Sequence, residues 1–523
     1  MQRRQLLKSM GKLGAMGGAA LTMTSPLKVI AGTPIRSMSD ALPNSVDYKS
    51  EFNKALKLQP NLLGFTNVEH DFDCQELAIE GTMPKDIAGT FVRNGPGKHE
   101  RGAKRYQHLF EGDGMLQQFT IAEGKISHQG KFITTPKFMQ EDKANQFLYS
   151  GPDTKIVNSL PVSNANMINT ANTNVIPVGD DLWALWEGGS ATRVDADSLE
   201  FKEHITLGST QEYGQSLKGL PFSAHPKVEA NGDIWNFGLT PTGHIVLYHL
   251  SPTGQVKNVK LVNSRYRGGM LHDFLVTEKH VLLILPSLTI KKSSDKSASG
   301  YFSRTTFNEN IPMRVLVVAK SDFSVKREYE LAAGFAFHYG NAWEEPNGTI
   351  HFDASLYPNV DVLHKLSSIM QGDLTHTPNM DAKTALFTLY VNGSAHTSTV
   401  NENSEFPKIC DHLVGKRNNC LYYIASKKDS IWSDTVCALN TNTGAEESYH
   451  FGADFLVEEH VNICPSQVEG TGYLIGTALH IPTKRTCLNI FNVEHLSNGP
   501  LVRAWLPYHL PLGFHGHFSS SAV

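Results

Sequence analysis

Seven short hairpin patterns recur along this chain of 523 residues, and they constrain its fold more than any other feature. In each unit an apolar strand leads to a polar turn and then to a second strand of alternating character. Many units also have an apolar strand upstream, as in DIWNFGL (233–239) and CLYYIAS (420–426). The turns are centred near Ile121, Val194, Leu250, Lys320, Val391, Asn440 and Val493, in steps of 73, 56, 70, 71, 49 and 53 residues.

Hairpins at this spacing, without long helical patterns between them, indicate small antiparallel sheets repeated around an axis. We therefore predict an all-β fold, a seven-bladed β-propeller with a cap of helices and loops over a binding site. A large β-sandwich is the alternative. Cap segments are expected at roughly 40–80, 140–175, 285–310 and 355–382, where the pattern is missing. The segment 358–374 has the most helical pattern, with one apolar face formed by Val362, Leu363, Leu366 and Ile369.

The first residues resemble a twin-arginine export signal, because Arg3 and Arg4 precede Leu6, Leu7 and a Gly/Ala-rich apolar stretch. The alternative is a basic N-terminus without this role. We predict a signal segment at 1–31, a linker or N-terminal extension at 32–60, and a single propeller domain with cap insertions at 61–523. The signal predicts a bacterial periplasmic protein.

Charge and cysteine usage exclude some classes of function. A net charge of -4 without a basic stripe argues against nucleic acid as a partner. The six cysteines show no CxxC spacing, which disfavours zinc and iron–sulfur sites of that kind. A Cys410–Cys420 disulfide and buried free thiols both remain open.

Four histidines stand beside small or aromatic residues and precede or enter predicted strands: His225, His272, His338 and His515. They are separated by 47, 66 and 177 residues, so no single loop or helix could gather them. A propeller could, since the first strands of its blades all line the central axis. A set of imidazoles suits iron, copper or zinc. Four separate core histidines are the alternative.

Six motifs follow one another along the chain: GTFVRNGPGKH (89–99), HLFEGDGML (108–116), FSAHPK, LHDF, FHYGNAWE and GFHG. In this order they resemble the carotenoid cleavage oxygenases, a family of non-haem iron dioxygenases that includes the retinal pigment epithelium isomerase and the lignostilbene dioxygenases. The resemblance runs from about Leu62 to the C-terminus. It implies a seven-bladed propeller and Fe(II) held by His225, His272, His338 and His515. The choice of His515 over His517 rests on the family's F-H-G string.

The resemblance also implies carboxylates that orient the ligating histidines through their second ring nitrogen. Glu187 in ALWEGGS and Glu405 in SEFPKIC align with two of these glutamates. At the third position the chain departs from the family pattern, because His460 stands where a glutamate is expected. Either the register shifts and Glu459 serves, or a histidine or a water takes this role.

The resemblance implies that O2 cleaves a conjugated carbon–carbon double bond of a carotenoid or apocarotenoid to two carbonyl products. An apolar tunnel for the substrate is expected from Phe222, Phe335, Phe337 and Phe514, which could equally be packing residues. Peripheral membrane contact could serve substrate uptake.

Three alternatives remain open. A lignostilbene-type dioxygenase would need polar partners for a phenol, with Tyr106 and Lys137 as candidates. The others are an isomerohydrolase of retinyl esters and a metal-free propeller that serves as a binding scaffold. The string RNGP (93–96) is interpreted as a structural turn, with Arg93 paired to a buried carboxylate.

Overall fold

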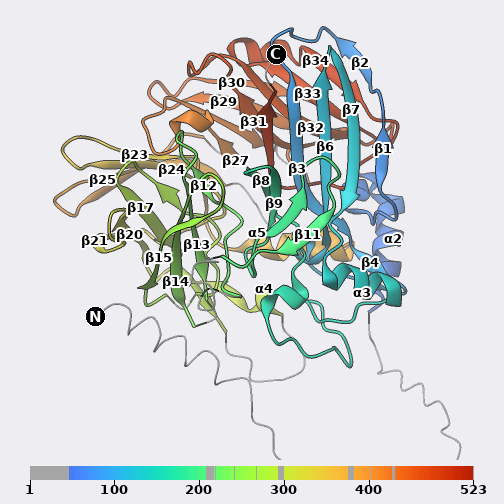
Figure 1. Cartoon of the computed structure of the whole chain (residues 1–523), viewed down its shortest axis with the longest axis horizontal. Coiled ribbons are helices and arrows are strands. Elements are labelled where there is room, and N and C mark those ends of the chain that lie inside the picture. The colour runs from blue at the N-terminus through green and yellow to red at the C-terminus, as the bar shows by residue number, and fades with distance from the viewer. Residues whose placement is uncertain are drawn as a thin grey trace, which may run out of the picture.

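The computed structural model describes residues 46–207, 217, 219–240, 242–266, 268–291, 300–374, 382–401, 403–426 and 430–521. The predicted signal segment, 1–31, lies outside these residues. Seven antiparallel sheets are arranged around a common axis, so the predicted seven-bladed β-propeller is confirmed (Figure 1). We number the sheets as blades 1 to 7 in chain order.

The first three blades cover residues 72–263, together with the C-terminal strand. Blade 1 contains β1 (Phe72–Cys74), β3 (Gly89–Lys98), β6 (Asp113–Ala122), β7 (Lys125–Phe132) and β35 (Gly516–Ser520). Blade 2 contains β8 (Asn174–Val178), β9 (Asp181–Leu185), β10 (Thr192–Asp195) and β11 (Phe201–His204). Blade 3 contains β12 (Lys227–Val228), β13 (Ile234–Leu239), β14 (His244–Leu250) and β15 (Val256–Asn263).

The other four blades follow in order. Blade 4 contains β16 (Leu275–Val276), β17 (His280–Leu285), β20 (Met313–Ala319) and β21 (Val325–Leu331). Blade 5 contains β22 (Phe335–Ala336), β23 (Ala342–Glu344), β24 (Ile350–Tyr357), β25 (Lys383–Leu389) and β26 (Ala395–Thr399). Blade 6 contains β27 (Glu405–Lys408), β28 (Cys420–Ala425), β29 (Thr435–Asn440) and β30 (Glu446–His450). Blade 7 contains β31 (Phe455–Ile463), β32 (Tyr473–His480), β33 (Arg485–Asn492), β34 (Val502–Trp505) and β2 (Ala78–Gly81).

Each predicted hairpin is a pair of neighbouring strands within one blade. The pairs are β6–β7, β10–β11, β14–β15, β20–β21, β25–β26, β29–β30 and β33–β34. The turns are short in six of them, whereas the 3-10 helix η5 (Val493–Asn498) connects the last pair. The hairpin pattern therefore located all seven blades.

Both ends of the described chain close the ring. The C-terminal strand β35 pairs with β3 in blade 1, and the N-terminal strand β2 pairs with β34 at the outer edge of blade 7 (Figure 1). Remote segments thus share two sheets, which leaves fewer unpaired backbone groups at the point where the ring closes.

Apolar side chains fill the spaces between neighbouring blades. Strand β20 shows the principle, since Val315 and Val317 pack toward blade 5 while Leu316 and Val318 pack toward blade 3. This two-residue alternation is the ordinary geometry of a strand buried on both faces. Each blade therefore contributes to the two apolar layers that flank it.

Helices and two small hairpins lie outside the blades. They are α2 (Tyr48–Leu58), η1 (Pro60–Phe65), β4 (Glu100–Arg101), β5 (Lys104–Arg105), η2 (Leu109–Glu111), α3 (Pro136–Ala144), η3 (Ala165–Ile168), β18 (Leu288–Ile290), α4 (Tyr301–Arg304), β19 (Thr305–Phe307), α5 (Asp361–Gln371) and η4 (Asp411–Leu413). No helix in the described ranges is both long enough and apolar enough to cross a bilayer.

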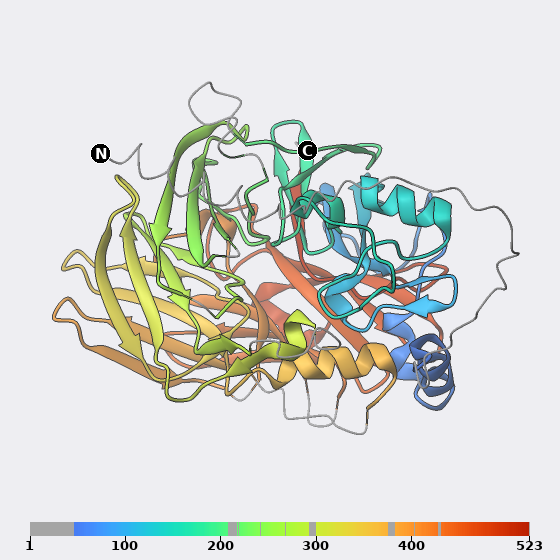
Figure 2. The ribbon, with the colours of Figure 1, turned by 90° about the horizontal axis from the view of Figure 1, so that it is seen from below.

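Helix α5 confirms the predicted helical segment. All four residues of its predicted apolar face are buried, and Gly372 ends the helix at φ +76°. Helix α2 falls within 32–60, predicted as a linker or extension, and its Phe52 belongs to the same apolar cluster as Leu366 and Ile369. Part of that extension is therefore packed against α5 (Figure 2).

The RNGP prediction is half right. These residues form part of strand β3 and make no turn, because they pair with β6 up to a register shift between Pro96 and Lys98. Arg93 does pair with a buried carboxylate, that of Glu458.

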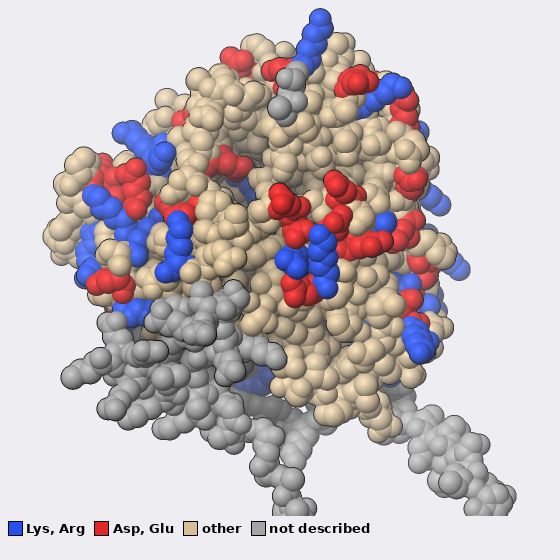
Figure 3. Space-filling model, viewed as in Figure 1, with Lys and Arg blue, Asp and Glu red and all other residues tan. Residues whose placement is uncertain are grey.

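On the face of the molecule drawn in Figure 3, basic and acidic side chains are intermixed.

Candidate metal centre

The structure brings the four predicted histidines together. Their ligand atoms all lie within 4.8 Å of one another, and all four side chains are buried. Nε2 of His225 is 2.9 Å from Nε2 of His272. The four come from blades 3, 4, 5 and 1, each just before or between the innermost strands of its blade.

Three carboxylates orient three of these imidazoles from behind. Oε2 of Glu187 lies 2.7 Å from Nδ1 of His272. Oε2 of Glu405 lies 2.5 Å from Nδ1 of His338. A proton on each Nδ1 donates to its carboxylate, so Nε2 keeps its lone pair and faces the centre of the group.

Glu459 supplies the third carboxylate. Its Oε1 is 2.9 Å from Nδ1 of His515, whereas His460 turns its own Nδ1 toward the carbonyl of Glu458. The cause is a register shift in β31 between Val457 and His460. This bulge places two successive glutamates in the buried interior, with Glu458 against Arg93 and Glu459 against His515. The structure therefore places Glu459, and not His460, beside His515.

Burial lowers the pKa of two of these imidazoles, those of His225 and His515, whereas at His272 the carboxylate of Glu187 outweighs burial and raises the pKa. Burial and the neighbouring imidazoles hold the pKa of His225 well below its usual value. Burial also lowers the pKa of His515 to about 4, against the opposite effect of Glu459. Glu459 is buried too, yet Lys408 and His515 together lower its pKa to about 2. Neutral imidazoles backed by ionised carboxylates are the form in which histidine binds metals.

The donor set fits a metal ion. Nε2 of His338 is buried and has no hydrogen-bond partner among the described residues. An orphaned buried acceptor is costly, and three further imidazole nitrogens face the same point. A divalent ion would satisfy all four lone pairs at once.

A cavity of about 1050 Å³ opens beside the histidines. His272, His338 and His515 line it, whereas His225 is not part of its wall. Most of the remaining wall is apolar and aromatic, including Phe110, Tyr266, Tyr301, Phe302, Phe337, Tyr357, Phe406, Trp432 and Phe514. The space suits an apolar molecule that contacts the imidazoles in its wall.

Two of the four predicted tunnel residues line this cavity. Phe337 and Phe514 are part of its wall. Phe222 and Phe335 are not part of the wall. The ring of Phe222 contacts Trp183 and Tyr248, and that of Phe335 contacts Phe337 and Tyr357. Sequence position beside a histidine could not separate these cases, since it does not tell which way a ring points.

Several cavity residues were missed by the sequence reasoning. Phe406 has φ +53°, and its ring centroid lies 4.9 Å from that of His338. Tyr357 donates from its hydroxyl to Oε1 of Glu405 at 2.6 Å. A non-glycine residue in the left-handed region is often a functional position, but the sequence gives no signal of this backbone conformation.

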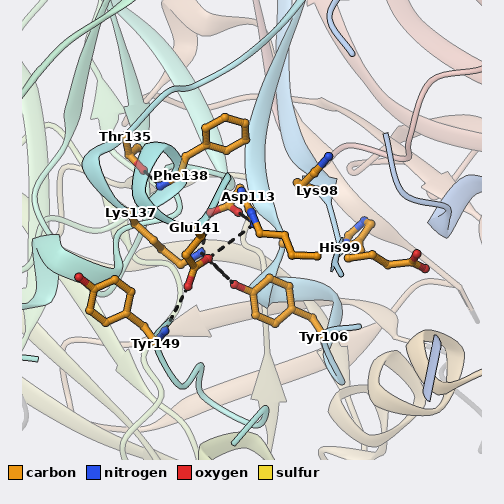
Figure 4. Close-up of polar contacts among 12 residues, drawn as sticks. Lys98, His99, Tyr106, Asp113, Thr135, Lys137, Phe138, Glu141 and Tyr149 are labelled. Carbon is orange, nitrogen blue, oxygen red and sulfur yellow. Dashed lines mark hydrogen bonds and ion pairs between the residues drawn. The ribbon is translucent and has the colours of Figure 1, made fainter. Parts of the chain in front are cut away.

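Tyr106 and Lys137, the predicted phenol partners, lie outside the large cavity. They belong to a buried cluster with Arg101, Asp113 and Glu141, which we call the Lys137 cluster (Figure 4). Nζ of Lys137 reaches Tyr106 at 2.9 Å, Asp113 at 2.7 Å and Glu141 at 3.0 Å. All three donors of the ammonium group are therefore used internally.

Comparisons with known proteins agree with this geometry. The family model described as retinal pigment epithelial membrane protein matches residues 65–520. Apocarotenoid-15,15'-oxygenase of Synechocystis is 26% identical, with 88% of this chain and 96% of the relative covered. Lignostilbene-alpha,beta-dioxygenase isozyme III of Sphingomonas paucimobilis is 25% identical over 88% of this chain and 98% of its own length.

Solved structures show the same fold. A cobalt-substituted apocarotenoid oxygenase of Synechocystis superposes with a TM-score of 0.77 at 24% identity, covering 88% of this chain and 99% of that one. A lignostilbene dioxygenase of Pseudomonas brassicacearum gives 0.75 at 22% identity, covering 87% and 97%. With its family model matched from blade 1 to the last strand, the chain belongs to the retinal pigment epithelial membrane protein family, as an O2-using oxidoreductase among the carotenoid cleavage oxygenases.

Proposed function

We propose that His225, His272, His338 and His515 hold Fe(II), and that the enzyme cleaves a conjugated double bond of a carotenoid or apocarotenoid to two carbonyl products. The observation that carries this proposal is the group of four buried imidazoles, three of which line a large, mainly apolar cavity. The resemblance of the six motifs to those of non-haem iron dioxygenases supports the choice of metal. When bound, the iron would supply the chemistry that brings O2 to the alkene.

The chain's own residues position the reactants. Glu187, Glu405 and Glu459 keep the Nδ1 protons of three imidazoles in place, so the ligand geometry is set before a metal binds. Phe337, Phe514 and the other aromatic side chains hold an extended polyene by apolar contact and keep water away from it. No nucleophile or general acid is required from the protein.

The test combines metal analysis with product identification. Purified protein is expected to contain one iron per chain, and labelled O2 should place label in the carbonyl products of an apocarotenoid. Retinol formed from a retinyl ester without O2 consumption would instead support the isomerohydrolase. Protein without metal, and histidine variants with unchanged ligand binding, would support a metal-free binding scaffold.

The stilbene alternative is less well supported by the polar contacts. A phenol would need Tyr106 or Lys137, and both are engaged within the Lys137 cluster. The small pocket beside them has a volume of only about 20 Å³, enough for a water molecule. Parallel assays with an apocarotenoid and a hydroxystilbene would decide, and faster cleavage of the stilbene would overturn our choice of substrate.

We also propose export to the periplasm through the twin-arginine segment, with Arg3 and Arg4 as the residues read by the translocase. Replacing both arginines by lysine should retain the protein in the cytoplasmic fraction of the producing bacterium. Unchanged distribution would contradict the signal.

Peripheral membrane contact is our proposal for substrate uptake. Val157, Leu160 and Val162 are exposed apolar side chains that directly precede Ser163, a cavity-lining residue. The double variant Leu160→Asp, Val162→Asp should bind less to lipid vesicles in sedimentation assays than the parent protein. Val391→Asp, at an exposed apolar position on blade 5, is the control and should leave binding unchanged.

A further inference from the structure

A second group of metal-binding side chains lies apart from the four histidines. It contains Cys410, His412 and Cys464, whose ligand atoms lie within 4.8 Å of one another. All six cysteines of the chain are free thiols, so the Cys410–Cys420 disulfide is not formed. The thiol of Cys410 interacts with that of Cys464 instead.

Two neighbouring blades bring the group together. Cys410 and His412 lie just after β27 of blade 6, where Cys410 caps the 3-10 helix η4. Cys464 directly follows β31, the inner strand of blade 7. The spacing between the cysteines resembles no zinc motif, which is why the sequence pattern disfavoured such a site.

The surroundings suit a cation with access from solvent. Cys410 is buried, whereas His412 and Cys464 are half-buried, so the group is open on one side. The carboxylate of Glu469 is held near the group by the backbone N–H groups of Asn419 at 2.6 Å and Cys420 at 2.8 Å.

We propose that Cys410, His412 and Cys464 form a second metal site, for a thiophilic divalent cation such as Zn²⁺. Two thiolates and one imidazole are a known three-ligand set for zinc, with a fourth position left for water. Binding replaces two thiol protons, so two protons leave for each cation bound. Without a cation, the thiol proton of Cys464 is donated from Sγ to the carbonyl oxygen of Val468, at an Sγ–O distance of 3.2 Å.

A bound cation would join the ends of two strands that serve the first centre. Strand β27 begins with Glu405, which bonds His338, and β31 contains Glu459, which bonds His515. The site would therefore link the two strands that supply both carboxylates. Its own ligands take no part in the four-histidine group, so binding at the two centres can be measured separately.

Co²⁺ titration of the purified full-length protein, kept reduced, tests the proposal. Thiolate ligands give Co²⁺ a strong charge-transfer absorption in the near ultraviolet, which an all-imidazole centre does not. We expect one such equivalent per chain and the release of two protons. Cys464→Ser should remove the absorption, and His412→Ala should weaken binding by about tenfold or more. Cys437→Ser, a buried cysteine on β29 of blade 6, is the matched control and should change nothing.

Several results would overturn the site. Absence of the absorption in reduced protein would do so, as would its persistence in Cys464→Ser. Formation of a Cys410–Cys464 disulfide in air, with no metal bound after its reduction, would show a redox pair instead. Because Cys464 and His412 are half-buried, their variants should keep the melting temperature of the metal-free protein, which checks that lost binding is not lost folding.

Discussion

The four-histidine centre and the Lys137 cluster are both buried and polar, but their polar atoms differ in the partners that the protein gives them. In the Lys137 cluster, two cations face two carboxylates, and every donor of the lysine has a partner within the protein, although Nε and Nη2 of Arg101 have none among the described residues. At the centre, four like groups face one another. Nε2 of His225 lies within hydrogen-bond distance of Nε2 of His272, whereas Nε2 of His338 has no partner among the described residues. Opposite charges stabilise one another in a buried cluster, whereas imidazoles that share a centre need a cation to engage all of their lone pairs.

The largest expected effect comes from removing one imidazole. His338→Ala should abolish iron binding and activity together, because a site with three ligands and a missing side chain recruits no replacement. Iron content by metal analysis and turnover of an apocarotenoid measure this. His517→Ala, one strand position beyond Gly516 on β35, should keep both. Full iron content in His338→Ala would show that the ligand assignment is wrong.

The Lys137 cluster should respond in stability instead. Lys137→Met leaves two buried carboxylates short of a cation, and breaking such a pair costs about 3–5 kcal/mol of unfolding free energy. Iron content of the folded fraction should be unchanged. Lys125→Met, at an exposed ion pair with Glu76, is the control and should leave the melting temperature nearly unchanged. Loss of turnover on a hydroxystilbene alone, at full stability, would show that Lys137 serves the substrate.

Glu405→Gln combines features of the two regions. This carboxylate lies at the four-histidine centre, but like the Lys137 cluster it has hydrogen-bond partners within the protein. It accepts from Nδ1 of His338, the hydroxyl of Tyr357 and the amide of Phe406. We expect iron affinity or activity to fall about 10- to 100-fold, with less effect on the melting temperature. Glu345→Gln, beside His351 on the surface of blade 5, is the control. Parallel loss of activity and melting temperature would mark Glu405 as a structural residue.

The most gradual expected effect, spread over several pH units, concerns a buried carboxyl that accepts backbone N–H groups. The oxygens of Asp353 accept the backbone N–H groups of Gly340 and Asn341, and burial raises its pKa from 3.8 to about 7. Between these two values the folded protein holds a proton that the unfolded chain has lost. Unfolding free energy should therefore fall as pH rises from about 4 to 7, by at most about 1.4 kcal/mol per pH unit.

Denaturant unfolding at pH 5 and pH 8 measures this slope. Asp353→Asn cannot ionise and should show a flatter dependence than the parent protein. Asp322→Asn is the control, because the pKa of exposed Asp322 is lowered to about 2 and this residue is ionised across the whole range. Equal slopes in the parent and Asp353→Asn would contradict the raised pKa.

Most of the fold and the four histidines could be predicted from the sequence, for different reasons. Hairpin turns, two-residue alternation and helical spacing are local patterns, so all seven blades and the apolar face of α5 could be predicted from the sequence. The histidines were identified by their motifs, not by spacing. The paired strands that close the ring, β35 with β3 and β2 with β34, join remote ends of the chain and had no local pattern.

The alternating hairpins and the motifs around His225, His272, His338 and His515 determined the architecture and the identity of the central residues, because turn chemistry and strand alternation act between near neighbours. Tertiary structure decided which groups complete them. The bulge in β31 placed Glu459, and not His460, beside His515. Of the two phenylalanines just before His338, only Phe337 lines the cavity. The contact of blades 6 and 7 placed Cys410 beside Cys464. Those outcomes depend on distances between side chains of different blades, which only the closed ring sets.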